Sequence, residues 1–585
     1  MSMVAVDSVL LAAAIGLPLL AAGALAVARW RTVGLNVAPW AAVPALLLAL
    51  TSRTGSSLQL PWLIQHTSLE LDAIGRIFLG FTSALWLASS WYARSYLARD
   101  SNPVRFYLFF LLAMWGNFVL ILAGDAPTFY VGFAAMGLAS AGLVFHRGDA
   151  VAARAGKVYL ILAMVGEVLI LSGLVYVTAI SGTTQIAELH RGVISQTSML
   201  LLLAGFGIKA GALSLHFWLP LAHPAAPVPA SAVLSGAMIK AGLLGWIRFL
   251  PLGNAAIPEV GLIMICAGLG AAFLGTLVGA VQSNPKTVLA YSSISQMGII
   301  TTGLGIGAFR PDSWLEIQTA VLIYATHHAL SKGSLFLSLG PAQAARTRLQ
   351  RAVVRVGLLV PALALAGAPF TSGALAKLVL KSNLVFLPDG WTGVVRILLT
   401  LAAVGTTLKM TRFLWLAWPR STNAPEDTPP GLWTPWLSLL AAVVLGVWLL
   451  PGALGWVPSK LTAEKLWLAT WPLLLGAALA AIGAKMRRWM SRDPSHWLPA
   501  GDMGVLLEKA IAHLQPREGA PFGSPGSRRR AAGAVETPSR WTVRWNSLGR
   551  WCHTVEKHLR SSPVAGAMWL FILALLLGLL VQSVG

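Results

Sequence analysis

The feature that most constrains this sequence is a series of apolar runs that recur about every 25 to 35 residues, each long enough to cross a bilayer as a helix of about 20 residues. Of the 585 residues, 56% are hydrophobic and only 11% are charged. Such a chain cannot hide its apolar surface in a single water-soluble core. The pattern predicts an all-α polytopic membrane protein.

We expect about sixteen membrane spans, and we interpret the first, Ala5 to Val27, as a retained span because it lacks the basic start and small-residue cleavage site of a signal peptide. The approximate bounds are 5–28, 34–51, 72–95, 105–123, 127–146, 157–179, 197–218, 230–250, 257–281, 288–309, 315–340, 354–380, 391–418, 432–450, 467–485 and 564–582.

The loops between these runs differ in charge. One alternate set holds most of the Lys and Arg residues, for example Arg147, Arg154 and Arg355, whereas the opposite set is sparse. The positive-inside rule assigns the rich set to the cytoplasm, so we expect the N-terminus to lie outside. The net charge of +22 follows from this topology, and because the basic residues form no single patch, nucleic acid is not an expected partner.

The residues that could hold a metal or a redox group are few. The two cysteines, Cys266 and Cys552, exclude a cysteine-held iron–sulfur cluster and a disulfide framework. His327 and His328 could bind zinc, but no cysteine or carboxylate lies near them in sequence to complete a tetrahedral site. We therefore predict neither a cofactor nor a metal site in this chain.

Two spans carry signs of a broken helix. The stretch LHFWLPLAHPAAPVPAS, residues 215–231, has four prolines between two apolar runs, and LAGAPFTSGALAK, residues 365–377, has Ala-Pro and Ser-Gly before Lys377. Broken backbone at membrane depth is tolerated only where it is buried in protein or lines a watery cavity. The breaks fall in spans seven and twelve, and this spacing predicts two five-span repeats.

Ionisable residues inside the spans are the next indication of function, since each costs at least about 2.5 kcal/mol at mid-membrane. They are Glu167, Lys209, Lys240, His327, His328, Lys332, Lys377, Lys381 and Lys409. His328 and Lys332 are four residues apart, so they share a helix face. Amines in a low-dielectric site and imidazoles can both exchange protons near neutral pH, so these residues could form a proton relay.

Glu167 is the in-span carboxylate that sequence distance brings nearest to Lys209. At an effective dielectric constant of about 20, two unit charges about 4 Å apart interact by about 4 kcal/mol. Moving this carboxylate could therefore load or unload a proton on Lys209.

A structural interpretation stands beside each of these residues. Lys209, Lys240, Lys332 and Lys377 could be structural lysines bonded to carbonyl groups, and we expect Lys381 and Lys409 to reach the membrane face by snorkelling. His216 either joins the relay or caps the broken half-helix, and His223 either joins it or forms part of the turn.

These segments resemble the antiporter-like subunits of respiratory complex I, formate-hydrogenlyase-type hydrogenases and multi-subunit cation/proton antiporters. The resemblance covers roughly residues 70–420 and rests on four stretches, LHFWLPLAHPAAPVPASAVLSGAMIKAGLLGWIRFL, NPKTVLAYSSISQMG, THHALSKGSLFL and AGAPFTSGALAK. It implies about fourteen core spans with two inverted five-helix repeats. It also implies a path for protons along Lys209, Lys240, His328, Lys332 and Lys377, other membrane and peripheral subunits as partners, and the bacterial inner membrane as location.

One position departs from the family. Members usually carry a glutamate in span five that pairs with the span-seven lysine, but in YVGFAAMGLAS this position is Ala134. Glu167 in span six could replace it. An acid in span six with none in span five is similar to the membrane subunit of inorganic-carbon accumulation complexes, which pair with a large zinc protein resembling carbonic anhydrase.

Three functions therefore stay open. The chain could move protons within a complex I-like or hydrogenase-like assembly, conduct protons to drive an inorganic-carbon partner, or brace a complex without conducting. We expect five regions. They are N-terminal helices (1–100), a first repeat (101–250), a second repeat (251–420), further core helices (421–490), and a tail with an amphipathic segment, a basic linker and a last span (491–585), which resembles the lateral helix and anchor of the longest members.

Overall fold

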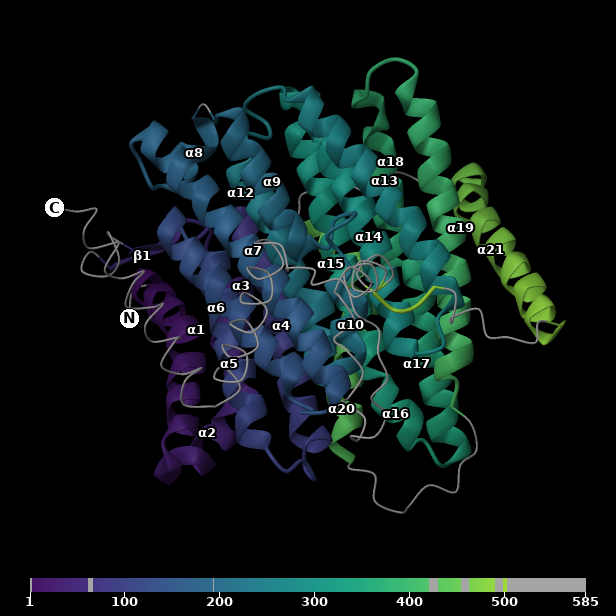
Figure 1. Ribbon diagram of the computed structural model, residues 1–585, viewed down its shortest axis with the longest axis horizontal. Helices are drawn as coiled ribbons and strands as arrows, with labels where there is room; N and C mark the ends of the chain where they lie inside the picture. Colours follow the sequence, from purple (N-terminus) through teal and green to yellow (C-terminus); the bar gives the residue numbers. More distant parts are fainter. Residues whose placement is uncertain are drawn as a thin grey trace, which may run out of the picture. The chain divides into compact units, whose positions relative to one another are not determined.

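The structure is a computed structural model that describes residues 3–60, 67–192, 194–419, 430–453, 462–489, 498–501 and 505. Two units divide the chain, residues 1–512 and residues 513–585, and the described residues all lie in the first. The long helices are α1 Met3–Ala26, α4 Ala73–Tyr96, α5 Pro103–Leu122, α6 Ala126–Phe145, α7 Ala150–Ser181, α9 Gln196–Ala210, α13 Pro258–Val281, α14 Pro285–Gly307, α15 Trp314–Leu337, α17 Arg348–Ala366, α19 Trp391–Ala417, α20 Trp433–Ala453 and α21 Ala463–Trp489. The short ones are α2 Arg31–Val37, α3 Val43–Thr51, α8 Ile186–Arg191, α10 Trp218–Ala225, α11 Val228–Val233, α12 Ile239–Phe249, α16 Leu339–Ala344 and α18 Ser372–Ser382 (Figure 1).

The prediction of an all-α polytopic membrane protein is confirmed. Within the described residues, eleven helical segments are long and apolar enough to cross a membrane. The central helices α14 and α15 are not among them, because they carry many polar residues and are almost entirely buried. A helix surrounded by other helices does not need an apolar surface, since no lipid touches it. Of the candidate site residues, α15 carries His327, His328 and Lys332.

A β-hairpin was not predicted. Strands β1, Ser56–Leu60, and β2, Thr67–Leu71, pair antiparallel between α3 and α4. The predicted second span, 34–51, is not one continuous helix, because α2, a 3₁₀ turn at Ala38–Trp40 and α3 follow one another there. The predicted last span, 564–582, and most of the predicted amphipathic segment, 498–514, lie outside the described residues.

Both predicted breaks are present, but the first lies earlier than expected. Helix α9 ends at Ala210, and residues 211–217 link it to α10, so span seven does not continue to residue 218 as predicted. The four prolines of residues 215–231 lie in or next to the short helices α10 and α11 instead of in the link. Span twelve divides into α17 and α18 at residues 367–371.

The two broken helices run in opposite directions. In Figure 1, α9 lies above α10, whereas α17 lies below α18. Opposite directions are what an inverted repeat requires.

Candidate functional site

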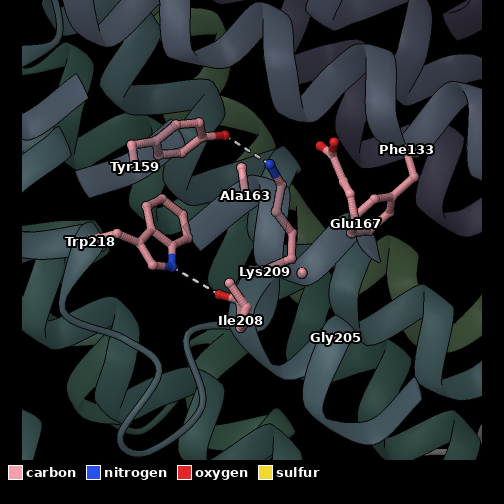
Figure 2. Close-up of a pocket in the computed structure, with 9 residues that line it drawn as sticks. Phe133, Tyr159, Ala163, Glu167, Gly205, Ile208, Lys209 and Trp218 are labelled. Carbon is pink, nitrogen blue, oxygen red and sulfur yellow. Dashed lines mark hydrogen bonds between the residues drawn. The ribbon is translucent and has the colours of Figure 1, made fainter. Parts of the chain in front are cut away.

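Lys209 lies in the last turn of α9, just before the break. The residue that follows the helix, Gly211, has a left-handed backbone with φ of 72°, as is common at helix C-termini. The Lys209 side chain is buried, and its Nζ donates a hydrogen bond of 2.9 Å to the Tyr159 hydroxyl of α7 (Figure 2). The Tyr159 hydroxyl in turn donates to the Gly137 carbonyl of α6 at 3.2 Å. Three helices thus hold one buried amine.

Glu167 of α7 lies near the same amine. A Cβ added to Gly137 would lie 2.5 Å from Glu167 Oε1 and 3.8 Å from Lys209 Nζ, so both charged groups border the space that this glycine leaves open. The two side chains interact electrostatically, although no direct ion pair joins them in the described structure. Glu167 Oε1 is buried and has no hydrogen-bond partner among the described residues. A buried carboxylate oxygen without a partner is unusual and indicates a functional position.

A cavity lies between these groups. Its lining comes from α6, α7, α9 and α10 and consists of Phe133, Tyr159, Ala163, Gly166, Glu167, Gly205, Ile208, Lys209 and Trp218 (Figure 2). About 10 Å³ is open to the centres of water molecules, which is room for about one. Trp218, the first residue of α10, donates to the Ile208 carbonyl at 2.8 Å and contacts the Tyr159 ring edge to face. This indole therefore ties the two halves of the broken helix together beside Lys209.

The two histidines near the first break, His216 and His223, lie in different elements. His216 is buried in the link, and its carbonyl accepts the Leu219 N–H, so it lies at the start of α10. His223 lies inside α10 instead of in a turn, and its ring stacks on Phe336 of α15 at 4.8 Å.

Lys240 lies on α12, directly after a π-helical turn, Leu234–Met238. Its side chain is fully buried, and its Nζ donates a hydrogen bond of 2.6 Å to the Ser235 carbonyl. In the π turn, the Ile239 N–H donates to Leu234 O, five residues back. Single π turns inside helices are frequent at functional sites.

Lys332 and His328 of α15 share a helix face, as predicted, and both are fully buried. Lys332 Nζ donates to the Leu289 carbonyl of α14 at 2.9 Å. Neither His328 ring nitrogen has a hydrogen-bond partner among the described residues, and His328 interacts electrostatically with Lys240 and Lys332. These three residues form one buried basic cluster.

His327 and Lys377 meet at the second break. His327 Nδ1 is 2.8 Å from the Ser372 hydroxyl at the start of α18. Lys377 Nζ donates to the last carbonyls of α17, Leu365 O at 3.0 Å and Ala366 O at 2.5 Å. A helix C-terminus carries partial negative charge, so this position favours an ammonium group. His327 also interacts electrostatically with Lys377 and with Lys240. It therefore lies between the second break and the buried basic cluster of Lys240, His328 and Lys332.

The expectation that Lys409 snorkels to the membrane face is wrong. Its side chain is fully buried in α19, its stem packs along Gly279 of α13, and its Nζ has no hydrogen-bond partner among the described residues. The small glycine lets α13 and α19 approach and cover the amine. Lys381 is only partly buried and donates to the Thr400 hydroxyl.

Two buried serines in the site could not be predicted from the sequence. Ser235 of the π turn and Ser293 of α14 bring their hydroxyl oxygens within 2.7 Å of each other. Serine is common in such helices, and only the folded chain brings these two together. Among the described residues, no three His, Cys, Asp or Glu side chains gather closely enough to hold a metal ion.

Comparisons with known proteins agree with this architecture. Residues 123–403 match the family described as "NADH:quinone oxidoreductase/Mrp antiporter, TM". The chain is 29% identical over 466 residues to NADH-quinone oxidoreductase subunit N of Moorella thermoacetica, and the alignment covers 76% of this chain and 95% of that protein. It is 30% identical over 296 residues to hydrogenase-4 component B of Escherichia coli, which covers 48% of this chain and 44% of that protein.

One solved structure has a similar fold. A chain of the Mrp complex from Dietzia sp. DQ12-45-1b superposes with a TM-score of 0.72 at 20% sequence identity. The superposition covers 99% of this chain and 63% of that chain.

Proposed function

We propose that the chain belongs to the family whose description matches residues 123–403, and that it conducts protons through the membrane as one subunit of a larger complex. The conducting groups are Lys209, Lys240, His328, Lys332 and Lys377, with Glu167, His216 and His327 beside them. The primary candidate is a complex I-like or hydrogenase-like assembly in the bacterial inner membrane, where the redox chemistry belongs to partner subunits.

The observation that carries the proposal is the environment of Lys209. Lys209 lies between a hydroxyl and a carboxylate, beside a cavity with room for about one water molecule. Each of these three groups can accept or pass a proton.

The same groups support a switch. With the Glu167 carboxylate close, a proton on Lys209 is stabilised by up to a few kcal/mol, since charges several ångströms apart still interact strongly in a partly desolvated site. When the carboxylate moves away or is neutralised, the ammonium loses this stabilisation and passes its proton on. The buried Lys240, His328 and Lys332 and the partly buried Lys377 then offer a succession of bases toward the second break.

The two predicted repeats, 101–250 and 251–420, belong to this proposal. Their support is that the two broken helices run in opposite directions (Figure 1) and begin their breaks in the same way, with a left-handed glycine after the helix. The first break then opens toward one side of the membrane and the second toward the other. The arrangement suits a path that enters at one side and leaves at the opposite side.

A second candidate function has one specific observation in its favour. The acid beside Lys209 comes from α7 instead of α6, where Ala134 stands, and this arrangement is similar to the membrane subunit of inorganic-carbon accumulation complexes. In that function, proton influx would drive a zinc-containing partner. Purification of the complex through a tag on this chain separates the two, because iron–sulfur, nickel or flavin subunits favour the first function and a large zinc protein favours the second.

Proton flux in proteoliposomes tests the proposal itself. The complex is reconstituted with its native partners, and the acidification of the vesicles is followed with a pH-sensitive dye for the wild type and for Lys209→Ala. We expect the variant to conduct about 100-fold more slowly, since removing a proton-transfer group typically costs that much or more. Equal flux in the two proteins, or none in the wild type, would instead favour a subunit that only braces the complex.

A further inference from the structure

A hydrogen-bonded pair of hydroxyl groups lies between two of the buried lysines. Lys240 of α12 belongs to the first predicted repeat and Lys332 of α15 to the second, and α14 packs against α15. Each ammonium group is bonded to a backbone carbonyl, Ser235 O for Lys240 and Leu289 O for Lys332. A carbonyl can hold a proton donor but cannot pass a proton on, so these bonds alone do not connect the two lysines.

The hydroxyls of Ser235 and Ser293 fill the gap between these carbonyls. Their oxygens are 2.7 Å apart, and either can be the donor. The Ser293 hydroxyl also donates to Leu289 O at 3.0 Å, the same carbonyl that accepts from Lys332. One continuous set of contacts therefore runs from the residue that holds Lys240 to the carbonyl that holds Lys332.

The pair has two possible orientations. When Ser293 donates to Leu289 O, its only hydrogen is used, so Ser235 must donate to Ser293. When Ser293 turns to donate to Ser235, the Leu289 carbonyl keeps only the Lys332 bond. A hydroxyl pair that can reverse in this way accepts a proton at one end and gives one up at the other, and it resets by rotation of the two O–H bonds.

The π-helical turn positions Ser235. The π turn at Leu234–Met238 shifts the helix hydrogen bonds by one residue, and the Ser235 carbonyl accepts from the Lys240 amine that follows five residues later. Both serine side chains are fully buried. The two hydroxyl groups are therefore shielded from bulk solvent.

We propose that the Ser235–Ser293 hydroxyl pair is the proton-conducting link between Lys240 and Lys332, and hence between the two predicted repeats. The link rests on the proposed function. In one passage, the Lys240 ammonium turns from the Ser235 carbonyl to the Ser235 hydroxyl and gives it a proton, and Ser235 gives its own proton to Ser293. The Ser293 hydroxyl turns from the Leu289 carbonyl and gives its own proton to Lys332, which is neutral when it accepts. Each hydroxyl again holds one proton, Lys240 is left neutral and Lys332 is left charged, so atoms and charge balance.

The test compares proton flux of the reconstituted complex for the wild type, Ser235→Ala, Ser293→Ala and the double variant. Each single variant should lower the flux at least about tenfold, and the double variant should be no slower than the slower single variant, because both changes interrupt one link. The matched control is Ser292→Ala on the same helix, a buried serine whose hydroxyl has no hydrogen-bond partner among the described residues. This control should stay within about twofold of the wild type.

A second readout separates conduction from packing. The unfolding temperatures of the complexes are measured alongside the flux, and Ser293→Thr, which keeps a hydroxyl at the same position, should recover most of the flux lost in Ser293→Ala. The link is overturned if the wild type and Ser293→Ala conduct equally while Lys209→Ala is inactive, a result that leaves the proposed function intact. The link is also overturned if flux and unfolding temperature fall together in Ser235→Ala, Ser293→Ala and the double variant. A wild type that conducts no protons overturns the proposed function and the link with it.

Discussion

The two broken helices share their backbone geometry but hold their lysines on opposite sides of the break. Gly211 and Gly367 both end a helix in the left-handed region, with φ of 72° and 90°. In each case the following alanine N–H donates back to the carbonyl five residues earlier, at 2.9 Å. Three residues after each glycine comes a second left-handed residue, Ser214 in one break and Phe370 in the other. Two segments of unlike sequence thus build the same break.

The lysines differ in position and in partners. Lys209 precedes its break and bonds to a hydroxyl beside a carboxylate, whereas Lys377 follows its break and reaches back to two carbonyl groups. Carbonyl groups are fixed acceptors that do not titrate, but a carboxylate can move and can be neutralised. Under the proposed function, the first break holds a switchable site, whereas the second holds an amine whose acceptors do not titrate.

The largest effect on proton flux is expected from Lys377 at the second break. Lys377→Met removes the only amine at the second break and should lower proton flux about 100-fold, because no other titratable group in the described structure bonds to these helix-end carbonyls. The matched control is Lys381→Met, one turn along the same helix, whose partly exposed amine bonds to Thr400. Equal losses in the two variants would mean that the break has no special role.

The next effect concerns the switch. Glu167→Gln keeps the size of the side chain but removes its charge, so Lys209 loses the group that stabilises its proton, and coupled activity should fall about tenfold. Glu188→Gln, at an exposed position of α8, serves as the control and should behave as the wild type. If Glu167→Gln also matches the wild type in turnover and flux, Glu167 is not the replacement for the acid missing at Ala134.

A smaller effect is expected from Tyr159→Phe, which keeps the ring against Trp218 and removes the hydroxyl that accepts from Lys209. A typical intramolecular hydrogen bond contributes about 1 kcal/mol, so flux should fall about fivefold while the protein keeps its unfolding temperature within a few degrees. A fully active Tyr159→Phe would leave Glu167 as the sole partner that matters at Lys209.

The smallest effect comes from Gly137→Ala. The added methyl would lie 2.5 Å from Glu167 Oε1, the movable end of a side chain, so the helix can stay in place while the carboxylate shifts. Flux should fall about threefold without any change of charge, because the coupling between Glu167 and Lys209 depends on their separation. Gly80→Ala is the control, since its new methyl meets no atom closer than 3.9 Å. A wild-type rate in Gly137→Ala would show that the position of the carboxylate is not critical.

The first break shows how far the sequence could predict the fold. The prolines of residues 215–231 correctly indicated a broken span, but they misplaced the break. Proline is tolerated in the first turn of a helix, where its missing N–H has no partner to lose, and Pro229 occupies such a position in α11. The actual signal was Gly211, whose left-handed backbone ends α9. A single glycine is too common in membrane helices to stand out in sequence.

Some site residues could be predicted from the sequence, and others could not. The in-span charges Glu167, Lys209, Lys240 and Lys332 could be found from the sequence, because charge at membrane depth is costly and therefore conspicuous. The burial of Lys409 could not, since it depends on Gly279 of a helix about 130 residues away letting α13 cover the amine. The Ser235–Ser293 contact likewise depends on tertiary packing and on a π turn that leaves no pattern in the sequence.

Proton flux through the reconstituted complex with Lys209→Arg tests the central claim most directly. Arginine keeps the positive charge and can still donate to Tyr159, but it does not release its proton in a protein. The account predicts that Lys209→Arg conducts as slowly as Lys209→Ala, because the amine at this position must both take up and give up a proton. Wild-type flux in Lys209→Arg would contradict the account, since a fixed charge would then be enough.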